Sequence, residues 1–190
     1  MNDRVKIINE EILSNNWYTL KKITFDYQKK DGTWHNQSRE AYDRGNGAVI
    51  LLYNPTQRTV ILTHQFRLPT YINGNADGML IEACAGLLDK DQPDVAIKRE
   101  TEEELGYKIK DVKKIFESYM SPGSVTEILY FFVAEYSAKE KLNKGGGIED
   151  EDIDVLELPF EKALSMITSG EIKDGKTIML LYHAKIHSLI

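Results

Sequence analysis

The stretch AGLLDKDQPDVAIKRETEEELGY, residues 85–107, contains glutamates at Glu100, Glu102, Glu103 and Glu104. Like charges at neighbouring positions of a helix destabilise it by a few tenths of a kcal/mol each. Lysines usually dilute such a cluster on a solvated helix, but none is interleaved here. A ligand that neutralises the carboxylates would offset their repulsion.

Residues 91–106 predict a helix. Pro93 suits its first turn, Asp91 or Gln92 is the expected cap, and the helix should end at Gly106. Its apolar side should be a stripe at i, i+4 and i+8 spacing, formed by Ile97, Thr101 and Leu105.

The predicted helix directs its glutamates differently. Glu100 and Glu104 border the apolar stripe, Glu103 lies one step further round, and Glu102 points elsewhere. A solvated acidic face is the ordinary explanation for such a cluster. However, Gly86 ends an apolar strand and lets the backbone approach a ligand. Because Mg²⁺ prefers carboxylate oxygens, the segment favours a divalent-cation site.

The rest of the chain predicts strands around this helix. Strand-like stretches occupy residues 18–28, 47–54, 58–67, 79–86, 112–120, 128–136 and 153–159, and residues 33–44 are expected to return as the partner strand of 18–28 after a turn. Further helices are predicted at 160–170 and 176–188. This order predicts an α+β protein, an α-β-α sandwich with a mixed β-sheet between helices. Residues 1–43 should form an N-terminal β segment and residues 44–190 the main domain.

Composition narrows the class of partner. The 30 acidic and 24 basic residues give a net charge of −6, which argues against broad nucleic-acid or anionic-membrane binding. No apolar run reaches the roughly 18 residues of a membrane-spanning helix, and residues 1–13 are too charged for a signal peptide. The single cysteine, Cys84, is expected to be buried and not nucleophilic. These features predict a reducing, cytoplasmic location without nucleic-acid or membrane partners.

The opening stretch resembles the Nudix box, the signature of hydrolases that cleave nucleoside diphosphates linked to another moiety. Positions of that pattern are filled by Gly86, Arg99, Glu100, Glu103, Glu104, Gly106 and Tyr107. The usual mid-loop glutamate is replaced by Gln92 or Asp91, and the spacing to Arg99 is one residue short. Thr101 also stands where an aliphatic residue is usual. The missing mid-loop glutamate is not a principal metal ligand, so its replacement leaves the expected metal site intact. The pattern as a whole implies a Nudix fold.

The resemblance also implies a Mg²⁺ site, in which Mn²⁺ would substitute. The expected metal ligands are the Ala85 carbonyl, Glu100, Glu104 and Glu151. The expected catalytic set is Glu100, Glu103, Glu104, Glu151 and Asp152. Glu103 either assists or pairs with Arg99. Water attack on phosphorus is the expected reaction, helped by the charge of the cation.

A second acidic cluster, residues 149–154, follows the glycines at 145–147. An isolated acidic loop is usually solvated surface. The chain resembles the ADP-ribose/GDP-mannose pyrophosphatase branch of the Nudix hydrolases, in which such a loop supplies a metal ligand or a general base. Glu151 is the expected ligand and Asp152 the expected base, and the glycines would let the loop close.

Residues throughout the chain carry this resemblance, including NNWYTL at 15–20 and QSREAYDRGNGA at 37–48. The implied substrate-binding residues are Trp17, Ser38, Arg39, Glu40, Arg67, Ala85, Gly86, Leu87, Glu104, Glu127, Asp150, Glu151 and Lys176. Trp17 would stack on the base, and Arg67 would bind the diphosphate. Residues 38–40 would reach the nucleotide from a partner subunit, which implies a homodimer. Without the resemblance, Trp17 would be interpreted as a core or interface residue.

Two other patterns are interpreted as structural. GEIKDGKT at 170–177 matches a P-loop, but the helix predicted before it makes Gly170 a helix cap. His183 and His187 form an i, i+4 pair, and without a third ligand they are interpreted as a surface pair.

The sequence therefore predicts a Mg²⁺-dependent hydrolase of nucleoside diphosphate sugars. GDP-mannose, giving GMP and mannose 1-phosphate, is the first candidate substrate, and ADP-ribose or another ADP-sugar is the second. The alternative from a different class is a Nudix-fold sensor that binds nucleotide sugars without hydrolysing them. A pure binder has no need of Glu100, Glu103 and Glu104.

Overall fold

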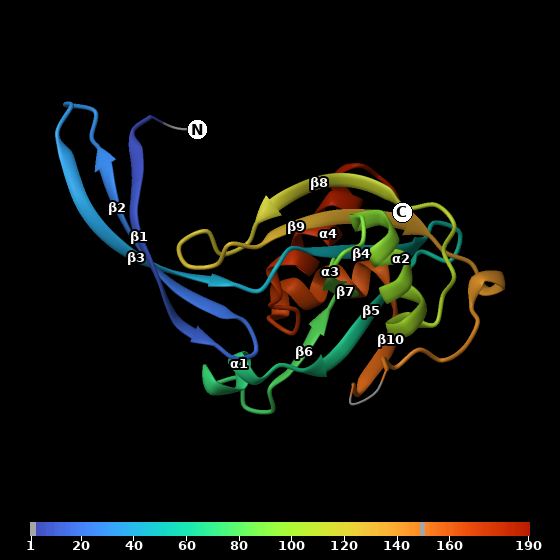
Figure 1. Ribbon diagram of the computed structural model, residues 1–190. Coiled ribbons are helices and arrows are strands. Elements are labelled where there is room, and N and C mark those ends of the chain that lie inside the picture. Colours follow the sequence, from blue (N-terminus) through green and yellow to red (C-terminus); the bar gives the residue numbers. More distant parts are fainter. Residues whose placement is uncertain (1–2, 149–150) are drawn as a thin grey trace. The chain divides into compact units, whose positions relative to one another are not determined.

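The computed structural model describes residues 3–148 and 151–190 (Figure 1). The chain divides into two compact units. The first contains the N-terminal residues up to Asn46 together with Tyr119–Ile128, and the second contains Gly47–Ser118 and Leu129–Ile190.

The first unit is built on a three-stranded antiparallel sheet. Its strands are β1 (Val5–Asn15), β2 (Thr19–Gln28) and β3 (Trp34–Asp43), in that order. The sequence pattern did not predict β1, because register shifts between Ile7 and Asn9 and between Ile12 and Ser14 interrupt its alternation. Many apolar side chains of this unit are exposed, namely Val5, Ile7, Ile8, Ile12, Leu13, Trp17, Trp34 and Tyr42.

The second unit contains a seven-stranded mixed sheet, apart from Tyr119 at the end of β8 and Ile128 at the start of β9, which fall in the first unit. Its central path is β10-β5-β4-β9-β8, while β6 pairs with β5 and β7 with β4. The strands are β4 (Gly47–Asn54), β5 (Thr59–Phe66), β6 (Met79–Glu82), β7 (Ala85–Leu87), β8 (Lys113–Tyr119), β9 (Ile128–Glu135) and β10 (Ile153–Pro159). Strands β4 and β9 are parallel, whereas β5 is antiparallel to β4, β6 and β10.

One predicted strand is divided in two. Residues 79–86 were expected to be continuous, but Glu82 pairs with Thr63 of β5, and Ala85 pairs with Val49 of β4. The chain therefore changes its partner strand between Glu82 and Ala85. This change of partner places Gly86 on β7, opposite Ala48 of β4 and next to the Glu100 side chain.

The helices are α1 (Leu68–Ile72), α2 (Pro93–Glu100), α3 (Phe160–Ser169) and α4 (Gly175–Ile186), with short turns η1 (Thr101–Leu105) and η2 (Ala138–Glu140). Helix α1 was not predicted. The N-cap residue of α2 is Gln92, and therefore not Asp91, the other expected cap. The Gln92 side chain makes no capping hydrogen bond. The helix continues through one π-helical turn, η1, and ends as predicted at Gly106, whose φ is 75°.

The core of the second unit surrounds β4, all of whose residues are buried. Helices α2 and α4 both pack against this strand, and α3 packs against α4 (Figure 1). One buried cluster joins Ile50 and Leu52 to Ile97 and Leu105 of the α2–η1 segment, and it includes Cys84. A mixed sheet packed against helices confirms the predicted fold class.

Candidate active site

The α2–η1 segment carries the glutamates of the candidate site. The predicted stripe is fully buried, and the Thr101 hydroxyl donates a 2.6 Å hydrogen bond to the Ile97 carbonyl oxygen. Because this face points into the core, Glu100 and Glu104 point toward the sheet side of the helix.

Glu104 is the most buried carboxylate of the segment. Its side chain is 4% exposed, and among the described residues its Oε2 atom has no hydrogen-bond partner. Burial raises the pKa of Glu104 to about 7; a hydrogen bond with Cys84 opposes that shift, and the charges of Glu100 and Glu151 add to it. Arg67 is close enough for its positive charge to lower this pKa.

Glu100 packs directly on Gly86. A Cβ atom at position 86 would overlap the Glu100 side chain, so this position admits only glycine without rearrangement. Burial raises the pKa of Glu100, the charge of Arg99 opposes this shift, and Glu103 and Glu151 add to it.

Arg99 holds the loop before the helix to the helix itself. Its Nη1 atom lies 3.0 Å from Glu100 Oε1 and 3.3 Å from Glu103 Oε2. Its guanidinium also lies 3.7 Å from Asp89 and 3.8 Å from Asp91. Glu103 therefore pairs with Arg99, which is the second of its two predicted roles.

The triple glycine packs against the end of the helix. Gly145, Gly146 and Gly147 have φ values of 69°, 114° and 84°. Gly146 N donates a 2.9 Å hydrogen bond to the Glu104 carbonyl oxygen, and Gly147 N donates a 3.2 Å bond to that of Glu103. These bonds satisfy carbonyl groups that a helix end leaves unpaired. Loop closure by the glycines stays a prediction.

Glu151 lies next to this loop. It is exposed, and its Oε2 atom accepts a 2.9 Å hydrogen bond from Ile148 N. It is nevertheless close enough to raise the pKa of both Glu100 and Glu104. Asp152 is exposed, and Asp150 lies outside the described residues. A cavity of about 660 Å³ adjoins this region, lined by Arg99, Glu102, Glu103, Asn143, Gly145, Gly147 and Ile148.

The helix carboxylates fit a divalent cation. Within residues 3–148 and 151–190, no three or more His, Cys, Asp or Glu side chains converge as a ligand set. Glu100 and Glu104 nonetheless supply two hard oxygen donors with raised pKa values, and one buried oxygen of Glu104 lacks a partner. Glu151 accepts from Ile148 N through Oε2 alone, which leaves its Oε1 atom available as an oxygen donor.

A network that the sequence did not reveal links two predicted substrate ligands. Glu82, whose side chain is 4% exposed at the end of β6, accepts from Arg67 Nε at 2.6 Å and from Lys176 Nζ at 2.5 Å. Lys176 Nζ also donates to Asp174 at 3.0 Å. The available signal was one acidic residue inside the apolar run 79–86.

The remaining predicted ligands belong to the first unit. Trp17 lies between β1 and β2 and is 84% exposed, with its ring centroid 6.2 Å from that of Tyr18. The core interpretation of Trp17 is therefore wrong.

The other ligands predicted in this unit lie on β3 and beside it. Ser38, Arg39 and Glu40 are exposed on β3, where Ser38 Oγ lies 3.0 Å from the Thr24 hydroxyl. Glu127 Oε1 lies 3.6 Å from the Nε atom of Arg44.

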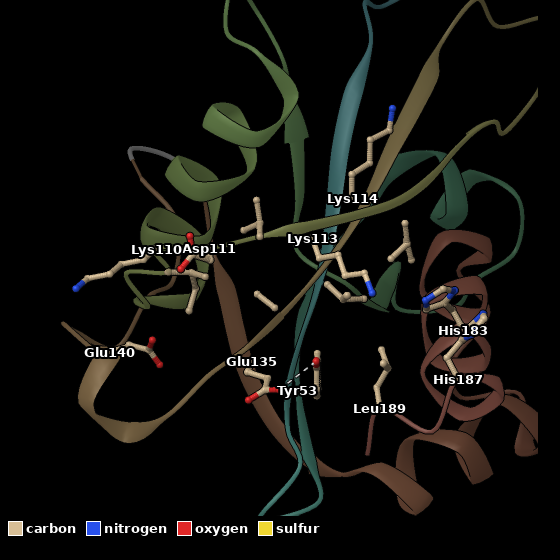
Figure 2. A pocket seen from close by; sticks show the side chains of 15 residues that line it. Tyr53, Lys110, Asp111, Lys113, Lys114, Glu135, Glu140, His183, His187 and Leu189 are labelled. Carbon is tan, nitrogen blue, oxygen red and sulfur yellow. Dashed lines mark hydrogen bonds between the residues drawn. The ribbon is translucent and has the colours of Figure 1, made fainter.

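A cavity of about 780 Å³ lies elsewhere in the second unit and is lined by none of the predicted site residues. Figure 2 shows His183 and His187 on one side, with Lys113 extending toward them, and Glu135 accepting a 3.4 Å hydrogen bond from Tyr53. Burial, followed by the charges of His187 and Lys113, lowers the pKa of His183. The imidazole centroids are 4.3 Å apart, and no third ligand completes a metal site among the described residues.

The predicted structural role of residues 170–177 is confirmed. Helix α3 precedes Gly170, whose φ of 80° makes it a left-handed C-cap. A P-loop needs a strand at this place.

The site combines a helix that carries several glutamates with a short strand that contains Gly86, both packed on a mixed sheet. Comparison with known proteins assigns this arrangement to one family. Residues 43–181 match the NUDIX domain, and the chain belongs to the Nudix hydrolases. Members of this family generally use a divalent metal ion. Residues 4–42 match the N-terminal domain of the GDP-mannose pyrophosphatase NudK.

Full-length relatives have the same extent. GDP-mannose pyrophosphatases of Salmonella arizonae, Shigella dysenteriae serotype 1 and Escherichia coli O157:H7 are each 55% identical over 190 residues, which is 100% of both chains. A solved structure of an ADP compounds hydrolase covers 99% of this chain and 98% of its own, with a TM-score of 0.74 and 17% identity. That likeness shows the fold. None of the helices in the described residues has both the length and the hydrophobicity of a membrane-spanning helix.

Proposed function

We propose that this Nudix hydrolase cleaves the pyrophosphate bond of GDP-mannose to give GMP and mannose 1-phosphate. The observation that carries the proposal is the full-length similarity to GDP-mannose pyrophosphatases, which includes the NudK-type segment at residues 4–42. The cluster of Glu100, Glu103 and Glu104 supports catalysis over binding alone, because a binder gains nothing from repelling carboxylates.

Glu100 and Glu104, with the Ala85 carbonyl oxygen and Glu151, are the proposed ligands of Mg²⁺ or of Mn²⁺. When bound, the cation supplies charge neutralisation at the diphosphate and lowers the pKa of a water molecule. Asp152 is the proposed base, and Glu103 keeps Arg99 against the helix at 3.3 Å. The backbone of Gly86 and Leu87 is proposed to contact substrate beside Glu100.

Arg67 and Lys176 are the proposed cationic ligands of the substrate. The Arg67 side chain is 40% exposed and lies within electrostatic range of Glu104. An arginine fork matches the oxygens of a diphosphate in geometry as well as in charge.

The nucleotide and sugar are assigned to further residues. Trp17 would stack on guanine, and its exposure supports that role. Ser38, Arg39 and Glu40 are proposed to act from the partner subunit of a homodimer, and the remaining assigned ligands are Glu127 and Asp150. A reducing, cytoplasmic location is part of the proposal and is supported by the single free cysteine, Cys84.

Turnover of GDP-mannose and ADP-ribose should be measured side by side, with Mg²⁺ and then with EDTA, and the products separated. We expect a higher kcat/KM for GDP-mannose, formation of GMP and mannose 1-phosphate, and loss of activity in EDTA. A preference for ADP-ribose would overturn the guanine assignment. No turnover of either compound would favour a sensor that only binds nucleotide sugars.

A further inference from the structure

Glu82 is a buried carboxylate with both oxygens occupied. Its Oε2 atom accepts from Arg67 Nε at 2.6 Å, and its Oε1 atom accepts from Lys176 Nζ at 2.5 Å. The side chain is 4% exposed. A charge-assisted bond at each oxygen fixes both the place and the direction of this carboxylate.

The inner end of this network is anchored to rigid elements. Lys176 also donates to Asp174, which caps α4 by accepting a 2.9 Å hydrogen bond from Thr177 N. Ala83 N donates a 2.6 Å bond to the buried Thr177 hydroxyl, which ties the end of β6 to the start of α4. The position of Glu82 is therefore set by a strand and a helix cap, independently of the exposed Arg67.

Arg67 is held from one side only. An arginine has five N–H donors, of which Nε supplies one and the two terminal nitrogens supply four. Within residues 3–148 and 151–190, those terminal nitrogens make no hydrogen bond or ion pair. The side chain is 40% exposed, and its charge lowers the pKa of Glu104, so the guanidinium lies within electrostatic range of the helix carboxylates.

We propose that Glu82 is the positioning residue for Arg67: by holding Nε, it presents the two terminal amino groups to the diphosphate of the substrate. This inference rests on the proposed function, because it needs a substrate that carries a diphosphate. Glu82 itself touches no substrate. The side-on contact keeps the bidentate edge of the arginine for phosphate oxygens, which an end-on ion pair would consume.

A merely structural ion pair would produce a different energetic pattern. If Glu82 acts through Arg67, its removal matters only while Arg67 is present. If Glu82 serves only the fold, its removal should weaken binding equally with or without Arg67. A double-mutant cycle separates these cases, because it measures the part of the effect that the two side chains share.

The cycle comprises the wild type, Glu82→Gln, Arg67→Ala and the double variant. The dissociation constant for GDP-mannose is measured by calorimetry in EDTA, where no turnover occurs, and kcat/KM is measured with Mg²⁺. We expect about a tenfold loss of affinity in each single variant and no further loss in the double variant. Independent losses that multiply to about a hundredfold in the double variant, or wild-type affinity in Glu82→Gln, would overturn the proposal.

Two variants guard against a trivial result. Glu161→Gln removes an exposed carboxylate that pairs with Arg58 and Lys185, and it should bind like the wild type. Glu82→Asp keeps the buried negative charge but is one methylene short of Arg67 Nε. It should therefore fold, lose affinity, and show no added loss in the Arg67→Ala background, even where Glu82→Gln is unstable.

Inorganic pyrophosphate is the second probe in the same cycle, since it carries the diphosphate without nucleoside or sugar. A wild type that binds pyrophosphate but neither binds nor hydrolyses GDP-mannose would overturn the proposed function. The cycle with pyrophosphate would still decide the role of Glu82. Additive losses with both probes would overturn the positioning role while leaving the proposed function intact.

Discussion

Glu104 carries a large electrostatic cost in the metal-free site, because its carboxylate is buried and its Oε2 atom lacks a partner among the described residues. Burial raises its pKa from an ordinary value of 4.5 to about 7. A bound cation would favour the charged form and remove this cost.

The raised pKa of Glu104 predicts how the stability of the metal-free protein depends on pH. Between pH 4.5 and about 7 the folded state keeps a proton that the unfolded state has lost. The contribution of Glu104 to the free energy of unfolding should therefore be largest below pH 4.5. It should fall as the pH rises toward 7, by up to about 1.4 kcal/mol per pH unit. Urea unfolding in EDTA across this range measures the slope, which Glu104→Gln should flatten. Equal slopes in both proteins would contradict the buried titration.

Trp17 is exposed enough to stack on a base, which predicts a selective effect on substrate affinity. Trp17→Ala should raise KM for GDP-mannose about tenfold, with a smaller fall in kcat, because stacking stabilises the ground and transition states alike. Steady-state kinetics test this, with Trp34→Ala as the matched tryptophan control. An unchanged KM, or a protein that no longer folds, would refute the stacking role.

Local sequence signals were enough to predict the buried stripe and the position of Glu100 and Glu104 beside it, while their role as metal ligands stays a prediction. The role of Glu82 was not predictable, because its partner Lys176 is 94 residues away in the chain. The ion pair of Glu103 with Arg99 was foreseen only as one of two alternatives. Pairings that depend on tertiary structure leave no local pattern.

The α2–η1 helix and the glycine loop form one packed element. Gly146 and Gly147 donate to the last carbonyl groups of the helix, and a Cβ atom at Gly145 would overlap the backbone of Glu104 and Leu105. The loop therefore caps the helix that ends at Gly106 and packs against the backbone of Glu104.

Gly145→Ala should consequently lower the free energy of unfolding by more than about 1 kcal/mol, because it adds both a steric overlap and a strained φ of 69°. It should also weaken Mg²⁺ binding measured by calorimetry. Gly123→Ala is the control, since a Cβ atom there meets nothing within 4 Å. A Gly145→Ala protein as stable as Gly123→Ala would exclude the packing role.

Most elements of the second unit were predictable because their apolar periodicity is regular. Strand β1 was missed because register shifts break its alternation, and the division at residues 83–84 was missed because the apolar run continues through it. Helix α1 follows Arg67 in a segment with proline and glycine turn signals, which favoured a loop.

At the scale of the molecule, the three-stranded sheet of the first unit leaves many of its apolar side chains exposed within one chain. A sheet of this kind gains stability when another surface covers it. This supports the predicted homodimer.

Analytical ultracentrifugation should accordingly give about twice the chain mass of 21.7 kDa. Ile12→Asp, which places a charge at a side chain 62% exposed in the single chain, should shift the protein to monomer. Ile186→Asp is the control, because that residue is 75% exposed on α4. A monomeric wild type would contradict the dimer.

Turnover of GDP-mannose by Glu100→Ala at saturating Mg²⁺ is the most direct test that the helix carboxylates act as metal ligands. We predict that kcat falls by at least about a hundredfold while the circular dichroism spectrum and Tm stay close to those of the wild type. The loss has a stated cause, since Glu100 is one of the two helix carboxylates proposed to bind the cation. A variant that folds normally and keeps a rate within twofold of the wild type would contradict the assignment of the site.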